Sequence, residues 1–550
     1  MAIPQGETLL FTPASPQPGA VSLIFAFPNI YSVGITSLGY QTVWAALASR
    51  EDLEVSRLFL DCGEDLPRAP ELLGFSFSWE LDYGNILTLL ERLNIPLLAT
   101  ERGENHPLVF GGGPVLTANP EPFADFFDLI LLGDGETLIP NFTEAYQNIR
   151  GKNREEQLTA LAQIPGIYVP SAYAVTYTEA TGPITAITPK DQAIPATVQK
   201  QTYRGDTLLA SSVVTPAAAW ENIFMAEVAR SCPEMCRFCL ASYLTLPFRA
   251  ANLEGSLIPA IERGLKATRR LGLLGASVSQ HPEFSDLLNY LAQPQYQDVR
   301  LSLASVRTNT VTPQLAQTLA QRGSKSLTIA IESGSEKIRR IVNKKLEQEE
   351  IFTAAANARA GGLKGLKFYG MAGVPGETLD DLEATAALFK QLKKTAPGLR
   401  LTLGCSAFVP KSHTPFQWLG VNPAAEKRLQ WLQKHLRPLG VDFRPESYQW
   451  SVIQALLSRG DRRLTPLLLL TRDYGDSLGS YKRAFKELRG QLPPLDFYVH
   501  QDWPRDWILP WSHLLGPLPA PTLAKHLETA LGQMTDDRFQ LSVMTSLGKS

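Results

Sequence analysis

The residues whose spacing most specifically indicates chemistry are three cysteines, Cys232, Cys236 and Cys239, in the pattern C-x3-C-x2-C. The chain has five cysteines in 550 residues, too few for a disulfide framework. Thiolates are the ligands of iron-sulfur clusters, and three of them on one short loop can bind three irons of a cubane cluster. The fourth iron is then open to another molecule.

Zinc binding and chance clustering are the alternatives to an iron-sulfur cluster. A structural zinc site normally uses a fourth Cys or His at similarly short spacing. No such residue follows the motif. The remaining cysteines, Cys62 and Cys405, lie far away in the sequence, and we expect both to be small buried hydrophobic side chains.

The cysteine motif directly follows a predicted strand at Ile223 to Val228, which begins a series of strands and helices. One helix is predicted over Ser256 to Leu271, and further strands are predicted at Leu274 to Val278, Arg300 to Ser305, Ser326 to Ile331, Gly365 to Tyr369 and Arg400 to Cys405. Six such units favour a partial (β/α)6 TIM-like barrel with functional residues at the strand ends.

The N-terminal part of the chain also alternates apolar strands with amphipathic helices, which predicts an α/β, Rossmann-like, doubly wound parallel sheet. The predicted strands are Val21 to Phe27, Val55 to Leu60, Leu72 to Ser78, Leu108 to Phe110 and Leu129 to Leu132. We expect four regions: this sheet (1–150), a bridging segment of short extended pieces without helical period (151–216), the barrel (217–420) and a smaller α-rich accessory region (421–550).

Composition excludes several classes of protein. The formal net charge is -2, with 44% hydrophobic and 19% charged residues, which is typical of a soluble globular chain and not of a strongly basic nucleic-acid binder. No apolar run spans a membrane, and the N-terminus lacks signal-peptide features, so we expect a cytoplasmic protein. Residues 421–490 hold 13 Lys and Arg against 7 Asp and Glu, which indicates a solvated helical surface or a site for an anionic substrate or RNA.

The cysteine loop resembles the signature loop of the radical S-adenosylmethionine (SAM) superfamily, including the aromatic Phe238 before the last cysteine. The resemblance implies that the open iron binds the amino and carboxylate groups of SAM, with Phe238 in the SAM site. It also implies that one electron from a 4Fe-4S cluster cleaves SAM to methionine and a 5′-deoxyadenosyl radical. A reductant such as flavodoxin or ferredoxin would supply the electron.

Further positions match this family and imply SAM contacts. Ser277 and Ser279 stand where the family often has a Gly-Gly-Glu segment, although the Glu is missing here. Glu332 resembles a polar residue that meets the SAM ribose or amino group, with a helix cap or solvent-facing carboxylate as the alternative. Gly373 lies where the backbone approaches adenine, or is only a tight turn. Arg307 follows the third strand and is matched to the SAM carboxylate or ribose.

Residues 407–418 are similar to a stretch of radical SAM proteins that carry a cobalamin-binding-like N-terminal domain, and residues 459–463 resemble a segment of the same uncharacterised subgroup. His413 in the first stretch is expected to be structural. The resemblance implies that the nucleotide tail of cobalamin passes Ser76, Gly111, Gly112 and Gly113. The loop after the first strand lacks the Asp-x-His-x-x-Gly of that fold, so histidine ligation of cobalt is not expected. A domain that only supports the barrel or binds a partner is the alternative.

The function that these motifs imply is radical SAM catalysis, with cobalamin-dependent methyl transfer to an unactivated carbon of a small molecule, peptide or RNA. A cobalamin-independent rearrangement, ring formation or RNA or peptide modification is the alternative. A non-catalytic protein with a structural or redox-sensing cluster is a third hypothesis. The cysteine triplet argues against it, because a structural cluster favours four cysteine ligands.

Overall fold

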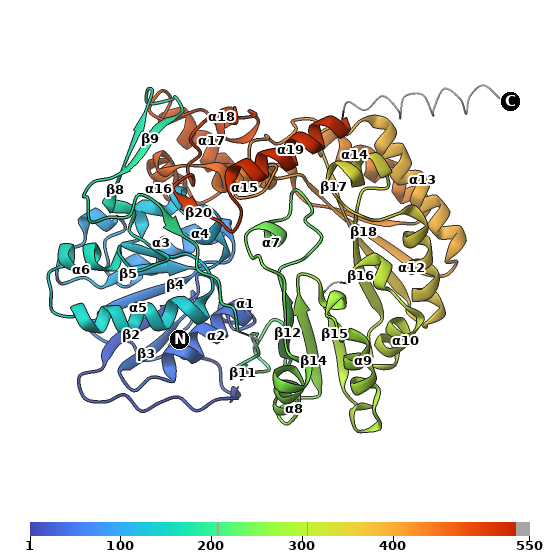
Figure 1. Cartoon of the computed structure of the whole chain (residues 1–550), viewed down its shortest axis with the longest axis horizontal. Helices are drawn as coiled ribbons and strands as arrows, with labels where there is room; N and C mark the ends of the chain where they lie inside the picture. Colours follow the sequence, from blue (N-terminus) through green and yellow to red (C-terminus); the bar gives the residue numbers. More distant parts are fainter. Residues whose placement is uncertain (206–207, 305, 535–550) are drawn as a thin grey trace.

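One half of the molecule is built on a six-stranded sheet, drawn in blue and cyan in Figure 1. The computed structural model describes residues 1–205, 208–304 and 306–534. The sheet order is β3-β2-β4-β5-β6-β7, and only β7 runs antiparallel to its neighbour. This is one of the two common doubly wound orders. The strands are β2 (Val21–Ala26), β3 (Leu53–Leu58), β4 (Leu72–Ser76), β5 (Leu108–Gly112), β6 (Leu129–Leu131) and β7 (Ile167–Tyr168).

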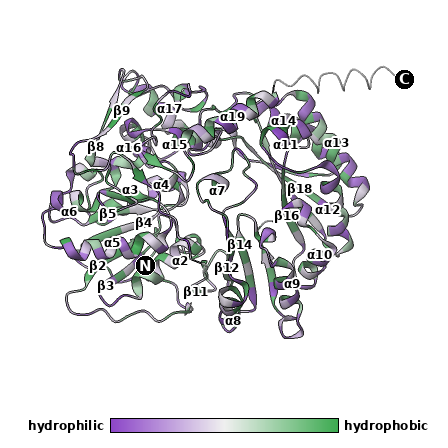
Figure 2. Cartoon of the chain, in the orientation of Figure 1, coloured by the Kyte–Doolittle hydropathy of each residue, from purple (hydrophilic) through white to green (hydrophobic). Residues whose placement is uncertain are grey.

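Helices flank this sheet and bury its apolar strands, which stand out as hydrophobic in Figure 2. Near-continuous burial of β2, β4 and β6 is the pattern of parallel strands covered on both faces. Two of the helices, α2 and α5, pack against each other. The helices of this half are α1 (Tyr31–Gly34), α2 (Leu38–Ala48), α3 (Tyr83–Arg92), α4 (Pro114–Ala118), α5 (Gly135–Ile149) and α6 (Arg154–Leu161).

The other half is an open barrel of two four-stranded sheets, ordered β13-β12-β14-β15 and β16-β17-β18-β19. A parallel bridge from Val306 to Ile329 links them. Six strands follow each other in chain order, as predicted, and β13 and β19 lie at the edges. The strands are β12 (Phe224–Arg230), β13 (Arg249–Ala250), β14 (Arg270–Gly275), β15 (Arg300–Leu303), β16 (Ser326–Glu332), β17 (Gly365–Ala372), β18 (Arg400–Ala407) and β19 (Asp442–Pro445).

Helices α9 (Phe284–Ala292), α10 (Pro313–Gln321), α12 (Gln348–Ala360) and α13 (Leu379–Thr395) lie along the outer side of the barrel (Figure 1). The short helix α7 (Leu240–Tyr243) lies between the two halves of the molecule. The remaining helices of the barrel are α8 (Ile258–Leu265) and α11 (Glu336–Ile341). The structure therefore confirms the α/β class with a doubly wound sheet and a partial barrel.

Several local predictions were wrong. The helix predicted to reach Leu271 ends at Leu265, and β14 begins at Arg270, four residues before the predicted strand at Leu274. Leu271 and Leu273 both point into the barrel core, as alternate residues of a strand do. A short apolar run such as this one fits either a strand or the end of a helix, so the sequence alone did not decide between them. Ser305, the predicted end of the third strand, lies outside the described residues.

The bridging segment contains one helix that was not predicted, α6. The Asn153 side chain caps it by accepting the Glu156 N–H at 2.9 Å. The strands of this segment are short: β7 joins the first sheet, and the others form small sheets that pair β1 (Thr8–Leu9) with β11 (Val213–Val214), β8 (Tyr173–Tyr177) with β9 (Ile184–Pro189), and β10 (Val198–Gln199) with β20 (Leu514–Leu515).

Helix α14 (Ala425–Leu436) packs into the separate core of the barrel through Leu429, Leu432 and Leu436. The other C-terminal helices share one hydrophobic core with the first sheet. They are α15 (Tyr448–Arg459), α16 (Thr465–Asp473), α17 (Leu478–Glu487), α18 (Leu495–Val499) and α19 (Ala520–Met534). The last of these crosses the top of the molecule in Figure 1, from the side of the first sheet to the side of the barrel. In the part of the chain that the structure describes, no helix is long and apolar enough to span a bilayer.

Five of the 13 Lys and Arg residues between 421 and 490 form ion pairs with described carboxylates, and three of these pairs join the region to earlier parts of the chain. Arg428, Arg462 and Arg472 bond Glu377, Glu121 and Glu91, each in an earlier part of the chain. These arginines therefore join the C-terminal region to the rest of the molecule. Part of the positive charge of residues 421–490 therefore has a structural role, which the sequence alone did not indicate.

Glu121 is the centre of a buried cluster that joins the first half to the C-terminal region. Arg462 bonds Glu121 at 2.9 Å, and the Tyr168 hydroxyl also donates to Glu121. The His513 ring contacts the rings of Tyr168 and Tyr173, with centroids 5.1 and 5.3 Å away, and its Nε2 is 3.9 Å from Glu121. Burial lowers the pKa of His513 to about 4, so the ring is neutral at pH 7.

We expect the protein to lose stability as pH falls from about 6.5 toward about 4. In this range His513 of the unfolded chain binds a proton that the folded chain excludes, which costs on the order of 3 kcal/mol. The buried His413, whose pKa burial also lowers to about 4, adds a term of the same sign. Urea unfolding at several pH values should show a weaker dependence for His513→Phe than for wild type. His435→Phe, at the exposed His435 of α14, is the control; an unchanged dependence in His513→Phe would contradict the assignment.

Candidate functional site

The cysteine loop turns sharply as it leaves β12. Ser231 and Met235 adopt left-handed backbone conformations, with φ of +68° and +56°, which curl the loop between Cys232 and Cys236. The Cys239 N–H donates to the Cys236 carbonyl at 2.9 Å and closes the turn into α7. All three thiols are free, with Cys236 buried and the other two partly exposed.

Side chains that follow three other barrel strands hold this loop in place. The Asn343 side-chain amide donates to the carbonyl oxygens of Glu234 and Met235 at 3.2 and 2.8 Å. The Glu234 carboxylate accepts from Gln280 Nε2 at 2.6 Å and Arg307 Nη1 at 2.7 Å. Because Gln280, Arg307 and Asn343 come after β14, β15 and β16, the barrel topology itself fixes the shape of the loop.

The chemistry of this loop fits a metal cluster better than free thiols. Burial raises the pKa of Cys236 to about 12, and the nearby Lys344 opposes that rise. Thiols in such a place become thiolates only when a cation binds them. Among the described residues, no three His, Cys, Asp or Glu side chains meet closely enough to hold a single ion. A cluster does not require this, because each of its cysteines binds a different iron.

Three of the SAM-site candidates take part in the support of the loop. The Ser279 hydroxyl accepts from the Arg307 N–H at 3.1 Å and from the Thr310 hydroxyl at 2.6 Å. The Ser277 hydroxyl donates to the Gln280 side chain, which in turn bonds the cysteine loop. Arg307 pairs with Glu234. Their contact with SAM stays a prediction.

The other SAM candidates lie at or next to barrel strand ends. Glu332 ends β16 with a strained φ of +65°, and its carboxylate bonds Lys344 at 3.0 Å. Gly373 follows β17 with φ of +77°, and a Cβ there would lie 2.6 Å from Ala425 Cβ. The glycine is thus required by packing, whatever else its backbone contacts. Phe238 is partly buried against the first core.

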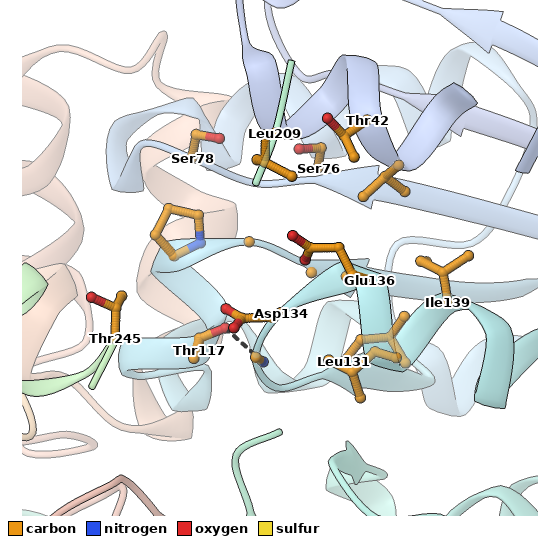
Figure 3. Close-up of a pocket in the computed structure, with 18 of the residues that line it drawn as sticks. Thr42, Ser76, Ser78, Thr117, Leu131, Asp134, Glu136, Ile139, Leu209 and Thr245 are labelled. Carbon is orange, nitrogen blue, oxygen red and sulfur yellow. Dashed lines mark hydrogen bonds between the residues drawn. The ribbon is translucent and has the colours of Figure 1, made fainter. Parts of the chain in front are cut away.

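A cavity of about 510 Å³ lies between the first sheet and the cysteine loop. Figure 3 shows its walls: Thr42 comes from α2, Ile139 from α5, Ser76 from the end of β4, and Thr245 from the segment after α7. The cavity therefore opens at the carboxyl ends of the strands, where doubly wound sheets bind ligands. One wall, at Leu240 and Ala241 of α7, directly follows Cys239.

The cavity brings together most of the predicted cobalamin residues. Ser76, Gly112 and Gly113 line it, whereas Gly111 points into the core, where a Cβ would meet Leu116 at 2.4 Å. Gly111 therefore serves packing, and the prediction that it contacts a ligand has no support in its position. Gly39, which the sequence did not single out, also lines the cavity, and a Cβ there would have no neighbour within 4 Å.

One polar atom in the cavity wall lacks a partner. The Thr42 hydroxyl is buried and forms no hydrogen bond with the described residues. Such an orphan atom costs about 1 to 3 kcal/mol unless a ligand or water satisfies it. The described lining contains no histidine. The sequence did not single out Thr42, because it is one polar residue on an otherwise apolar helix face.

The mouth of the cavity holds a buried ion-pair cluster centred on Asp134. Its carboxylate accepts from Arg249 at 2.7 Å and the Tyr203 N–H at 3.0 Å, and lies 3.4 Å from Arg230. Burial alone would raise the pKa of Asp134, but Lys200, Arg230 and Arg249 outweigh burial and hold this pKa below its usual value. Arg230 ends β12, immediately before the cysteine loop, so this cluster joins the two halves at the site.

Two family profiles match the chain. One, described as "Radical SAM proteins, N-terminal", matches residues 63–170, and one described as "Radical SAM superfamily" matches residues 227–389. The chain therefore carries radical SAM domains. The second match contains the three cysteines and the barrel strands up to β17, so this radical SAM chain is an enzyme that uses a 4Fe-4S cluster and SAM.

Individual proteins resemble this radical SAM enzyme over most of its length. The uncharacterized protein MJ0966 of Methanocaldococcus jannaschii is 27% identical over 466 residues, which cover 84% of this chain and 93% of that protein. The solved radical SAM methyltransferase TsrM from Kitasatospora setae, with cobalamin and a [4Fe-4S] cluster bound, has a TM-score of 0.50 at 13% identity. The match covers 86% of this chain and 99% of TsrM. At this identity the likeness shows the shared fold.

A second solved structure, the cobalamin-dependent SAM radical enzyme OxsB with aqua-cobalamin and SAM bound, has a TM-score of 0.48 at 11% identity, over 86% of this chain and 72% of OxsB.

We expect Cys236→Ala to lose both the iron of the cluster and the cleavage of SAM. The reason is that three of the four irons each need a cysteine ligand, and only two cysteines would remain in the loop. Iron and acid-labile sulfide per chain, with the visible absorption of the reconstituted protein, measure the first effect. Cys62→Ala, at a buried cysteine outside the loop, should keep both. Retention of full iron content and SAM cleavage in Cys236→Ala would overturn the ligand assignment.

Proposed function

We propose that this chain is a cobalamin-dependent radical SAM enzyme that transfers a methyl group to an unactivated carbon. The observation that carries the proposal is the position of the cavity. It is lined on one side by Gly112 and Gly113 at the end of β5, and on the other by α7, which starts at the residue after Cys239. A ligand in the cavity would lie beside a cluster on the cysteine loop.

The three cysteines would hold the cluster, which supplies the electron that cleaves SAM to methionine and a 5′-deoxyadenosyl radical. The protein's part is to keep this loop rigid and dry. Asn343 and Glu234 fix its backbone, and Lys344 and Glu332 place one positive and one negative group near Cys236. Such polar groups can bind the carboxylate and amino group of SAM, and this is the role that we assign to them.

The apolar slot between α2 and α5 would take the nucleotide tail of cobalamin, which when bound carries the methyl group. Small residues such as Gly39 and Gly112 leave room for the tail. Thr42 also lines this slot. We propose binding without a histidine ligand, because none lines the described cavity.

The reaction balances when two SAM molecules and two electrons act on one substrate. One SAM gives methionine and the radical, which takes a hydrogen atom from the substrate and becomes 5′-deoxyadenosine. The other gives its methyl group and leaves as S-adenosylhomocysteine. A reductant such as flavodoxin or ferredoxin would supply the electrons. The substrate remains an unassigned small molecule, peptide or RNA.

We expect the reconstituted enzyme to form 5′-deoxyadenosine and S-adenosylhomocysteine together when it is supplied anaerobically with SAM, cobalamin and a strong reductant. Liquid chromatography with mass spectrometry measures both nucleosides. If 5′-deoxyadenosine forms alone, with or without cobalamin, the cobalamin-independent alternative is favoured. If none forms under strong reduction, radical SAM catalysis by this chain is contradicted.

We expect Gly39→Leu to weaken cobalamin binding at least tenfold, equivalent to about 1.4 kcal/mol, because the new side chain fills the slot. Retained cobalamin after gel filtration, read from its visible spectrum, measures the effect, and iron content should not change. Gly479→Leu is a matched control, since Gly479 is also the second residue of an exposed helix start. Equal cobalamin retention in both variants would argue that the tail lies elsewhere.

A further inference from the structure

Arg237 is a buried cation inside the cysteine loop itself. It lies between Cys236 and Cys239 in sequence and is 6% exposed. Its backbone N–H donates to the Val342 carbonyl at 2.9 Å, which ties the loop to the segment after α11. The Cys236 sulfur lies 3.8 Å from the Asn343 carbonyl oxygen, in the same short segment whose Arg340 and Ile341 carbonyls hold the guanidinium. A permanent positive charge is thus held beside the proposed cluster.

The partners of this guanidinium are neutral. Its Nη1 donates to the carbonyl oxygens of Arg340 at 2.9 Å and Ile341 at 2.6 Å, and to Gln533 Oε1 at 2.9 Å. The two carbonyls belong to the last turn of α11, the negative end of that helix. No carboxylate of the described residues forms an ion pair with Arg237.

Two other cations near the loop are neutralised. Arg307 pairs with Glu234 at 2.7 Å, and Lys344 pairs with Glu332 at 3.0 Å. In each case a positive and a negative charge lie within contact distance, so their fields largely cancel farther away. Arg237 differs from both, because among the described residues only carbonyl and amide oxygens contact its guanidinium.

The last described helix, α19, brings Gln533 to this place. His526 of α19 hydrogen bonds the Tyr243 hydroxyl at 3.0 Å, and that hydroxyl donates to the Met235 carbonyl in the cysteine loop. Leu523 and Leu527 anchor the helix in the core that it shares with the first sheet. Helix α19 also packs on α11. The position of Gln533 is therefore fixed by side chains along most of the helix.

We propose that Arg237, held in place by Gln533 of α19, raises the reduction potential of the cluster bound to the cysteine loop. Reduction adds a negative charge to the cluster. A buried positive charge stabilises that charge strongly, because little water screens it. Net charge and outer hydrogen bonds are known determinants of cluster potentials. Arg237 and Gln533 are thus positioning and tuning residues; the inference requires the cluster of the proposed function but neither cobalamin nor a particular substrate.

The test is a redox titration of the reconstituted full-length protein, followed by the electron paramagnetic resonance signal of the reduced cluster. Gln533→Glu keeps the size and the acceptor of residue 533 but places a carboxylate on Arg237. It should shift the potential to a lower value. Arg237→Gln removes the charge and should shift the potential in the same direction. Gln163→Glu adds the same negative charge at an exposed position of the first half and should leave the potential at the wild-type value.

The outcomes separate this inference from the proposed function. A wild-type chain that binds no 4Fe-4S cluster would contradict the proposed function and remove the basis of the inference with it. If the wild-type protein binds a cluster and the Gln533→Glu variant has the same reduction potential, the role of Arg237 is overturned and the proposed function is left intact. If the Arg237→Gln variant fails to assemble a cluster, the reduction potential of the Gln533→Glu variant still tests the role of Arg237. An equal shift in Gln163→Glu would show that only the total charge matters, and would also overturn the inference.

Discussion

The site depends on one buried interaction, the contact of Asp134 with Arg230 and Arg249. Asp134 stands at the carboxyl end of the first sheet, and Arg230 ends the strand that leads into the cysteine loop. Loss of one partner from a buried ion pair costs about 3 to 5 kcal/mol, because the other charge stays desolvated. Because separation of these charges is unfavourable, the ion pairs hold the carboxyl ends of the first sheet and of the barrel strand β12 against each other. The cavity is consequently lined from both halves, by the ends of the first sheet and by the segment that follows the cysteine loop.

Sequence reasoning reached the features that depend on local patterns. The cysteine triplet after a strand, the alternation of strand and helix, and the glycines after β5 are all local, and the structure has the strands and the loop in the expected order. The assignments that failed were ambiguous for a physical reason. Leu271 and Leu273 suit a helix end as well as a strand, and only packing against the other barrel strands selects the strand.

The supporting residues of the site could not be predicted in the same way. Asn343, Gln280 and Gln533 are ordinary polar residues in sequence, and they become important because distant strands and a C-terminal helix bring them to one loop. The same holds for Thr42, whose unsatisfied hydroxyl is a property of the cavity and not of its neighbours in the chain. Ser277 and Arg307 were found by family resemblance, yet their visible contacts support the loop.

The shared core of the first sheet and the last helices has a consequence for biosynthesis. Asn119 of the first half donates to the carbonyl oxygens of Ser458 and Gly460 at 3.1 and 2.9 Å, and Glu121 is neutralised by Arg462. During translation these partners emerge from the ribosome only after the barrel has been made. The N-terminal half therefore reaches its final form late, and any ligand of the cavity between the halves would have to bind a nearly complete chain. Truncation from the C-terminal end would remove part of the core of the N-terminal sheet.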